Sequence, residues 1–215
     1  LFFRQSLSGE AKAREYLARR GLTPEIIQRF GIGYAPARWD ALLDRYGTTE
    51  DERQVLLRAG LVIERQSDAE RCQGPGFYDR FRDRVMFPIR DPRGRVIAFG
   101  GRALSKDVPA KYLNSPETPL FHKGYVLYNL DKARGPAHER GAVIAVEGYV
   151  DVIAMHRAGL PHAVAPLGTA LTEDQLALLW KIAPEPTLCF DGDAAGIKAA
   201  YRALDLALPL LKPGH

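Results

Sequence analysis

The sequence predicts an α+β protein: a mixed helical and β subdomain over residues 1–140, followed by an α/β subdomain over residues 141–215. Short helical patterns separated by glycines fill the beginning of the chain, and strand-like runs follow them. Residues 141–215 alternate short apolar runs with helical patterns, which is typical of a Rossmann-like parallel sheet with helices on both faces. We place the boundary near Gly135-Pro136.

Four short helices are expected before residue 60. Ser8 is the predicted N-cap of the first, which ends at Gly21, and Thr23-Pro24 begins the second, which ends at Gly31. Residues 39–46 and 52–59 carry two more, each followed by a glycine. We interpret Gly31-Ile32-Gly33 as a helix exit and not as a phosphate loop.

The middle of the chain predicts a hairpin and a long loop. Residues 84–90 and 95–99 read as strands, and Asp91-Pro92-Arg93-Gly94 between them suits a type I turn. Gly100-Gly101 then lacks side chains, so another part of the chain can approach its backbone closely. The polar residues 111–123 predict an extended loop, and a loop of this length is more often functional than not.

Composition narrows the class of protein. The chain has 215 residues, of which 46% are hydrophobic and 26% charged, as in ordinary globular proteins. No stretch is apolar enough to span a membrane, so no membrane partner is expected. Cys72 and Cys189 form neither a disulfide framework nor a zinc pair, which favours a reducing, cytoplasmic setting. The start at Leu1 and the end at His215 suggest a piece excised from a longer protein.

Positive charge is concentrated in one part of the chain. The net charge is +4, whereas residues 77–140 alone hold thirteen Lys and Arg against seven Asp and Glu. Such clustering favours a phosphate-rich partner, although a solvated basic face would give the same pattern.

The last subdomain predicts acidic side chains at the ends of strands. Strands are expected at residues 142–146, 163–165 and 187–190, and helices at residues 149–158, from Thr172 onward, and from Ala194 to about residue 211. Glu147 follows the first strand, Gly168-Thr169 the second, and Asp191-Gly192-Asp193 the third.

The carboxyl ends of parallel strands lie at one edge of a sheet, so these three carboxylates can gather there and bind Mg²⁺. Each acid also has an interpretation other than metal binding. Asp193 suits a helix N-cap, and Glu147 and Asp191 could be turn residues.

Three segments resemble the Toprim domain, which primases, topoisomerases and certain nucleases share. They are Glu147-Gly148-Tyr149-Val150-Asp151, Leu167-Gly168-Thr169, and Phe190 to Gly196. Residues 80–89, 99–102, 111–118 and 121–124 resemble the catalytic core of bacterial DnaG-type primases in particular. This resemblance covers nearly the whole chain and is weakest over the opening helices.

The resemblance implies a metal-dependent nucleotidyltransferase that makes RNA primers on a single-stranded DNA template. Glu147, Asp191 and Asp193 would hold Mg²⁺ or Mn²⁺, with Asp151 in support. A basic groove would handle template and ribonucleoside triphosphates, with these members: Arg84, Arg102, Lys111, Asn114 and Lys123. Without the surrounding motif, Lys111 and Lys123 would be interpreted as ordinary exposed lysines.

The family pattern extends beyond this sequence. A further acidic cluster, an amino-terminal zinc domain and a carboxy-terminal helicase-binding domain are expected outside it, as are a replicative helicase partner and a place at the replication fork in the nucleoid. Activity of these 215 residues alone is therefore in question. Two rival interpretations remain, a Toprim nuclease or topoisomerase fragment, and a DNA-binding scaffold without catalysis.

Overall fold

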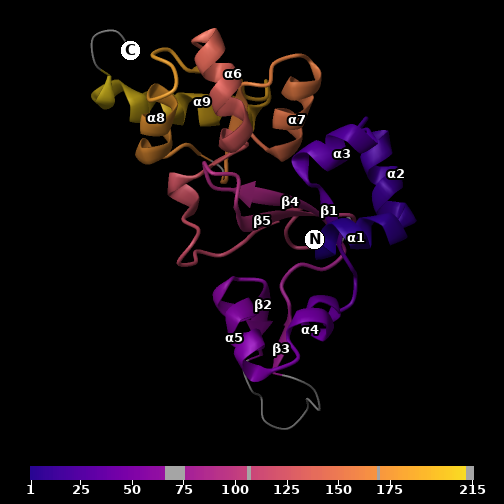
Figure 1. Ribbon diagram of the computed structural model, residues 1–215. Coiled ribbons are helices and arrows are strands. Elements are labelled where there is room, and N and C mark those ends of the chain that lie inside the picture. The colour runs from indigo at the N-terminus through magenta and orange to yellow at the C-terminus, as the bar shows by residue number, and fades with distance from the viewer. Residues whose placement is uncertain (66–75, 106–107, 169, 212–215) are drawn as a thin grey trace. The chain divides into compact units, whose positions relative to one another are not determined.

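A computed structural model describes residues 1–65, 76–105, 108–168 and 170–211, in two compact units (Figure 1). The first unit comprises Leu1–Pro88 and Ile97–Phe121, and the second comprises Ile89–Val96 and His122–His215. The predicted α+β class is confirmed, because both units combine helices with sheet. The chain passes between the two units at residues 88–89, 96–97 and 121–122. The domain boundary expected near residue 140 remains a prediction.

The first unit opens with five helices: α1 (Phe2–Gly9), α2 (Ala11–Arg19), α3 (Pro24–Phe30), α4 (Ala41–Tyr46) and α5 (Glu50–Arg58). Helix α3 is built as predicted, because the Thr23 side chain accepts from the Ile26 amide and Gly31 ends the helix at φ 69°. The expected cap at Ser8 is wrong. Ser8 lies inside the unpredicted α1, and Glu10 caps α2 by accepting from the Lys12 amide.

The larger sheet of the first unit has the order β1-β4-β5-β6. Its strands are β1 (Gly33–Ala35), β4 (Arg84–Arg90), β5 (Val96–Ala103) and β6 (Tyr112–Asn114). The predicted turn between β4 and β5 is present, since the Gly94 amide donates to the Asp91 carbonyl at 2.9 Å. The long loop expected over residues 111–123 is only partly correct, because β6 lies within it and pairs antiparallel with β5.

The close approach expected at Gly100-Gly101 occurs at Gly101. A Cβ there would lie 2.9 Å from Phe81 and 3.0 Å from Arg84. Side chains of the same unit therefore occupy the space that the glycine leaves.

Asp79 joins a second, two-stranded sheet to helix α4. It ends β3 (Phe77–Asp79), which pairs antiparallel with β2 (Val62–Glu64). Its buried carboxylate accepts from the amides of Leu42 at 2.7 Å and Leu43 at 3.2 Å, and so satisfies the first turn of α4. Burial raises the pKa of Asp79 to about 6, although the two amide donors act in the opposite direction.

This raised pKa predicts a pH-dependent stability. The folded state binds the Asp79 proton more tightly than the unfolded state, whose pKa is near 3.8, so the contribution of this group to stability falls as pH rises from about 4 through 6. In Asp79→Asn, the loss of unfolding free energy between pH 4.5 and 7 should be smaller than in the unmodified chain by about 1–2 kcal/mol. Urea denaturation at both pH values measures the difference, and parallel pH profiles would contradict the assignment.

The sheet of the second unit has the order β10-β8-β9-β7. Strands β10 (Thr187–Leu188), β8 (Ile144–Ala145) and β9 (Ala163–Pro166) are parallel, as predicted. The unpredicted β7 (Leu127–Tyr128) joins them antiparallel at one edge. Buried side chains from strands and helices, among them Leu127, Val143, Val164 and Leu179, form the core of this unit.

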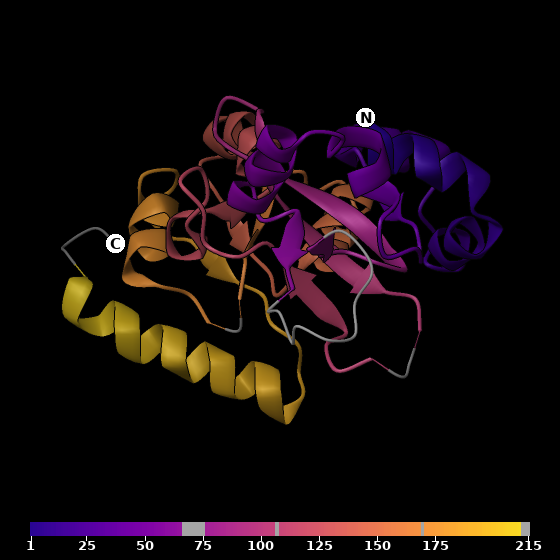
Figure 2. The same cartoon turned by 90° about the horizontal axis from the view of Figure 1, so that it is seen from below.

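Four α-helices accompany this sheet: α6 (Leu130–Arg140), α7 (Tyr149–Arg157), α8 (Glu173–Trp180) and α9 (Ala194–Ala207). Short 3₁₀ turns lie at Lys123–Tyr125 and Leu208–Leu210. Helix α9, the long yellow helix of Figure 2, lies at the outside of this unit. Helix α6 runs through Gly135 and Pro136, and its Leu130, Ala133 and Ala137 are buried. The domain boundary expected near these two residues remains a prediction.

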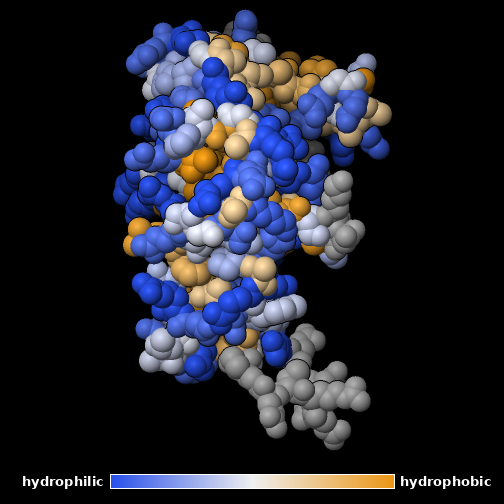
Figure 3. Space-filling model, turned by 90° about the vertical axis from the view of Figure 1, so that its right-hand side faces the viewer, coloured by the Kyte–Doolittle hydropathy of each residue, from blue (hydrophilic) through white to orange (hydrophobic). Residues whose placement is uncertain are grey.

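The helices and one face of the surface bear on whether the chain carries a membrane segment. Among the described residues, no helix is both long and apolar enough to cross a bilayer. The face drawn in Figure 3 is mainly hydrophilic, with small separate apolar patches. Cys189 is a free, exposed thiol, whereas Cys72 and Thr169, both singled out from the sequence, lie outside the described residues.

Candidate active site and nucleic-acid interface

Neighbouring parallel strands bring Glu147 and Asp191 together. Strands β8 and β10 pair in parallel, so the segments that follow them leave the same edge of the sheet. Glu147 comes just after β8 and Asp191 just after β10. The Asp191 amide donates to Oε1 of Glu147 at 2.9 Å, which fixes the Glu147 carboxylate against the backbone of the second acidic segment.

The negative charges of Glu147 and Asp191 act on the carboxyl group of Asp151. Asp151 lies in the first turn of α7, which begins directly after Glu147-Gly148. Desolvation raises the pKa of the Asp151 carboxyl group, and the negative charges of Asp191 and Glu147 raise it further. Asp151 is therefore repelled by both of the other acids, and a divalent cation bound nearby would relieve this repulsion.

Asp193 is engaged as a helix cap. Its Oδ1 accepts from the amides of Ala195 at 3.0 Å and Gly196 at 2.8 Å, at the start of α9. Both hydrogen bonds end on one oxygen of the carboxylate. The capping role left open by the sequence is thus present, and metal binding by Asp193 remains a prediction.

The donor set has the right chemistry for a hard cation, because Glu147, Asp151 and Asp191 offer carboxylate oxygens. Within the part of the chain that the structure describes, however, no three acidic, histidine or cysteine side chains converge closely enough to hold one metal ion. The acids share one edge without forming a closed ligand set.

Gly196 lets α9 pack directly on the acidic segment. A Cβ at this position would lie 2.1 Å from the Asp191 carbonyl oxygen and 2.7 Å from Oε1 of Glu147. Both distances are far shorter than a van der Waals contact. The missing side chain is therefore what allows the start of α9 to touch both acidic segments.

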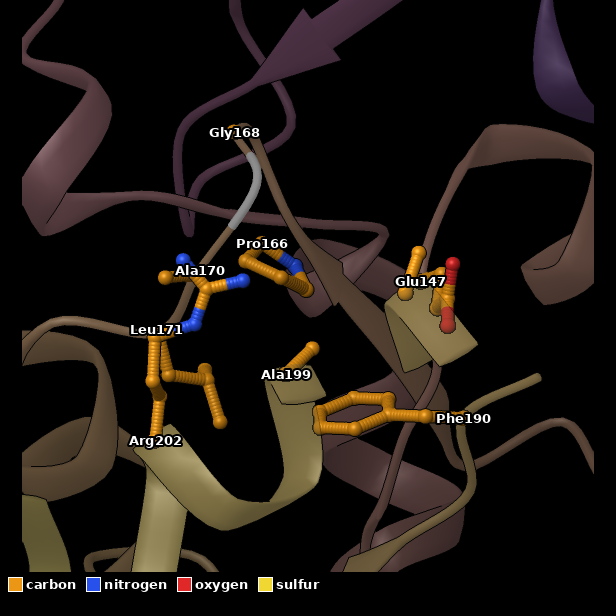
Figure 4. A pocket seen from close by; sticks show the side chains of 9 residues that line it. Glu147, Pro166, Gly168, Ala170, Leu171, Phe190, Ala199 and Arg202 are labelled. Atoms are coloured by element: carbon orange, nitrogen blue, oxygen red, sulfur yellow. The ribbon is translucent and has the colours of Figure 1, made fainter. Parts of the chain in front are cut away.

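A pocket of about 290 Å³ adjoins Glu147. Figure 4 shows Glu147 and Phe190 on one side of it, and Leu171 and Arg202 on the other. Apart from Glu147 and Arg202, the lining residues within the described part of the chain are apolar or glycine.

The predicted basic residues of the first unit differ in their surroundings. Lys111 is exposed, whereas Arg102 stacks on the Tyr16 ring at 4.4 Å and Asn114 is half-buried. Arg84 is buried, and it donates to the carbonyls of Ala110 at 2.9 Å, Gly101 at 3.2 Å and Lys111 at 3.4 Å. These bonds attach the segment that carries Lys111 to β5, so Arg84 positions a basic residue and presents little of its own surface.

Lys123, in the second unit, is held by an amide that the sequence did not single out. Buried Gln175 donates from Nε2 to the carbonyls of Lys123 and Val126, each at 2.9 Å. Its Oε1 accepts from the Thr172 amide, completing the capping box of α8. The signal was available, because Thr172 predicts a cap and its capping-box partner belongs three residues later.

We expect Gln175→Ala to lower the unfolding free energy by about 2–4 kcal/mol, because it removes a buried side chain that donates to two half-buried carbonyls and completes the capping box of α8. Urea denaturation measures this loss. Gln54→Ala is the control, since the exposed Gln54 side chain bonds, among the described residues, only to Glu50 of the same helix, and its loss should cost about 0.5 kcal/mol or less. Equal effects of the two substitutions would contradict the role of Gln175.

A second cation–aromatic cluster, Trp39, Tyr78 and Arg82, was missed from the sequence. The Arg82 guanidinium lies 4.0 Å from the centroid of the Trp39 ring and 5.1 Å from that of Tyr78. Trp39 is 56% exposed, although a tryptophan is normally largely buried. Exposed aromatic rings beside arginine are the surface that single-stranded nucleic acids use for base stacking.

Comparison with known proteins decides the family. The model of the DNA primase catalytic core, N-terminal domain, matches residues 2–134, and that of the Toprim domain matches residues 141–215. The chain belongs to the DNA primase catalytic core family. The resemblance drawn from the sequence is therefore confirmed.

Several relatives within the primase family cover the whole chain. It is 51% identical over 217 residues to a DNA primase of Pseudomonas putida and 49% identical over 216 residues to that of Escherichia coli K12. In both cases 100% of this chain aligns, but only 32% and 36% of the relative, so the chain spans about a third of their length.

Solved primase structures share the fold. A DNA primase domain from Pseudomonas aeruginosa has a TM-score of 0.90 and 51% identity, covering 99% of this chain and 65% of that one. A DnaG primase catalytic domain bound to single-stranded DNA has a TM-score of 0.86 and 47% identity, covering 100% of this chain and 65% of that one.

Proposed function

We propose that the protein containing this chain is a DNA primase, a DNA-directed RNA polymerase that makes short RNA primers for replication on single-stranded DNA. The observation that carries the proposal is the acidic edge of the Toprim unit, where Glu147 accepts from the Asp191 amide at 2.9 Å. The primase family of the first unit favours primer synthesis over the other Toprim activities. Like other replication primases, the protein would act in the cytoplasm, at the nucleoid.

The reaction is nucleotidyl transfer. The primer 3′-hydroxyl gives up its proton to solvent, and its oxygen forms a bond to the α-phosphorus of a ribonucleoside triphosphate. The bond from that phosphorus to the bridging oxygen breaks, and pyrophosphate leaves. Mg²⁺ or Mn²⁺, held by Glu147, Asp191 and Asp193 with Asp151 in support, would supply charge neutralisation and a more acidic 3′-hydroxyl. The Glu147–Asp191 hydrogen bond and the packing of Gly196 hold the carboxylates at one edge.

Nucleic acid and nucleotide would bind to basic groups in both units. In the first unit, Arg102, Lys111 and Asn114 would contact phosphates, with Arg84 positioning Lys111, and Trp39 and Arg82 would stack on bases. Lys123 would contribute from the second unit. A relative bound to single-stranded DNA supports a DNA template. Base pairing then selects each ribonucleotide, and affinity should fall steeply with salt.

Other partners would bind outside these residues. A replicative helicase would bind a carboxy-terminal domain, and zinc would be held by an amino-terminal domain, as the family pattern implies. The five histidines of the chain lack the spacing of zinc ligands.

The proposal is tested with the whole protein, single-stranded template and labelled ribonucleotides. Short RNA should appear with Mg²⁺ or Mn²⁺ and disappear when EDTA removes the metal. If labelled DNA is cut and no RNA forms, a Toprim nuclease or topoisomerase fits better. If the protein binds DNA but neither cuts nor polymerises, it is a scaffold.

A further inference from the structure

The second unit holds another pocket, whose lining residues are separate from the acidic edge. Its volume is about 510 Å³, in the range of ligand-binding pockets. Helix α6 provides Leu130, Arg134, Gly135 and His138, α8 and its end provide Leu178, Lys181 and Ile182, and Pro92 closes it from the β4–β5 turn. None of these eight residues belongs to the site described above.

The chemistry of the pocket is amphipathic and basic. Leu130, Leu178 and Ile182 form an apolar floor that continues the core of the unit. Arg134 and Lys181 add two exposed cations and His138 adds an imidazole, and none of the described lining residues carries a carboxylate. Within the described ranges, the side chains of Arg134, His138 and Lys181 form no hydrogen bond or ion pair with another residue. Their donors are therefore available to a ligand.

Gly135 is a second observation that points to the same pocket. Glycine inside a helix costs about 1 kcal/mol relative to alanine. Gly135 lies in the middle of α6 without the positive φ that requires glycine, and a Cβ there would meet no atom within 4 Å. Backbone geometry thus does not require glycine at this position, whereas its lack of a side chain leaves the pocket open.

We propose that this pocket binds an acidic peptide segment of a partner protein, which places an apolar side chain on the floor and carboxylates beside Arg134 and Lys181. An apolar floor with a cationic rim is complementary to such a segment. A free phosphate would leave the floor unused. A nucleic acid would use the cations, but none of the lining residues that the structure describes has an aromatic ring on which its bases could stack.

The test uses the 215-residue chain and a fluorescent, amidated hexapeptide of four aspartates followed by leucine and phenylalanine. Fluorescence anisotropy should show saturable binding that weakens with salt. Arg134→Gln with Lys181→Gln should raise the dissociation constant about fivefold or more, and Gly135→Leu, which fills the pocket while favouring the helix, about tenfold or more. Thermal unfolding checks that each variant is folded.

Matched controls separate this pocket from general charge effects. Arg29→Gln with Lys198→Gln removes the same charge from exposed positions outside the pocket and should leave the dissociation constant within about twofold. A hexapeptide with asparagines in place of the aspartates, or glycines in place of leucine and phenylalanine, should bind weakly. If no saturable binding occurs, or if Gly135→Leu leaves it unchanged, the proposal is wrong. If the pocket variants weaken binding of oligothymidylate and not of the peptide, the pocket serves nucleic acid instead.

Discussion

Asp191→Asn in the whole primase is expected to lower primer synthesis on the order of 100-fold, because it removes a negative charge from the acidic edge that would hold the divalent cation. The backbone hydrogen bond from Asp191 to Glu147 does not depend on the side chain, so the local fold should persist. The loss should be accompanied by weaker Mg²⁺ or Mn²⁺ binding, measured by isothermal titration calorimetry. Adding Asp193→Asn should lower synthesis further, while a capping amide oxygen remains at the start of α9.

Asp174→Asn is the matched control for this experiment. Asp174 is exposed, as Asp191 is, and it lies in the first turn of α8, a helix that carries none of the acids of the site. Its replacement should leave both primer synthesis and metal affinity within about twofold. Single-stranded DNA binding should be preserved in all of these variants, because the proposed DNA-binding residues are unchanged. Full primer yield from the double Asp191→Asn, Asp193→Asn variant would show that the metal site is assigned wrongly.

Local chemistry explains which elements the sequence predicts correctly. Helix α3 has its signals in adjacent residues, with Thr23 and Pro24 at the start and Gly31 at the end, and it forms as expected. Helix α6 was not predicted, because its residues carry no comparable local signals. Gly135 and Pro136 favour a break, but the burial of Leu130, Ala133 and Ala137 overrides that preference. The cap of α2 at Glu10 was not predicted either. Ser8 belongs to α1, which ends at Gly9, so it cannot cap the helix that follows.

Strand order limits what could be predicted of the site. The sequence places Glu147 and Asp191 at strand ends, but only the pairing of β8 with β10 makes those ends neighbours. The double engagement of Asp193 as a cap was an open alternative, and three-dimensional geometry was needed to see it. Trp39 and Arg82 are 43 positions apart in the sequence, so their contact could not be inferred from spacing at all.

Gly196→Ala is expected to impair the acidic site although it lengthens no charged side chain and improves helix propensity. In a solvent-exposed helix, replacing glycine by alanine raises the unfolding free energy by about 1 kcal/mol. Here the new Cβ would lie 2.1 Å from the Asp191 carbonyl oxygen, so the start of α9 or the acidic segment must move. Overpacking of this kind costs about 1–3 kcal/mol, which exceeds the gain in propensity. A displacement of about 1 Å at a reacting centre can cost on the order of 100-fold in rate.

Gly192→Ala provides an internal comparison from the same segment. Gly192 lies between the two aspartates, yet a Cβ there would meet nothing within 4 Å, and its φ is not positive. We therefore expect Gly192→Ala to retain primer synthesis within about threefold and stability within about 0.5 kcal/mol. Gly196→Ala should lower both the unfolding free energy in urea and primer synthesis. The two substitutions add the same methyl group four residues apart. A difference between them in unfolding free energy and primer synthesis therefore reports on the contact of α9 with Glu147 and Asp191. If both substitutions change the unfolding free energy and primer synthesis equally, this contact does not hold the acidic edge in place.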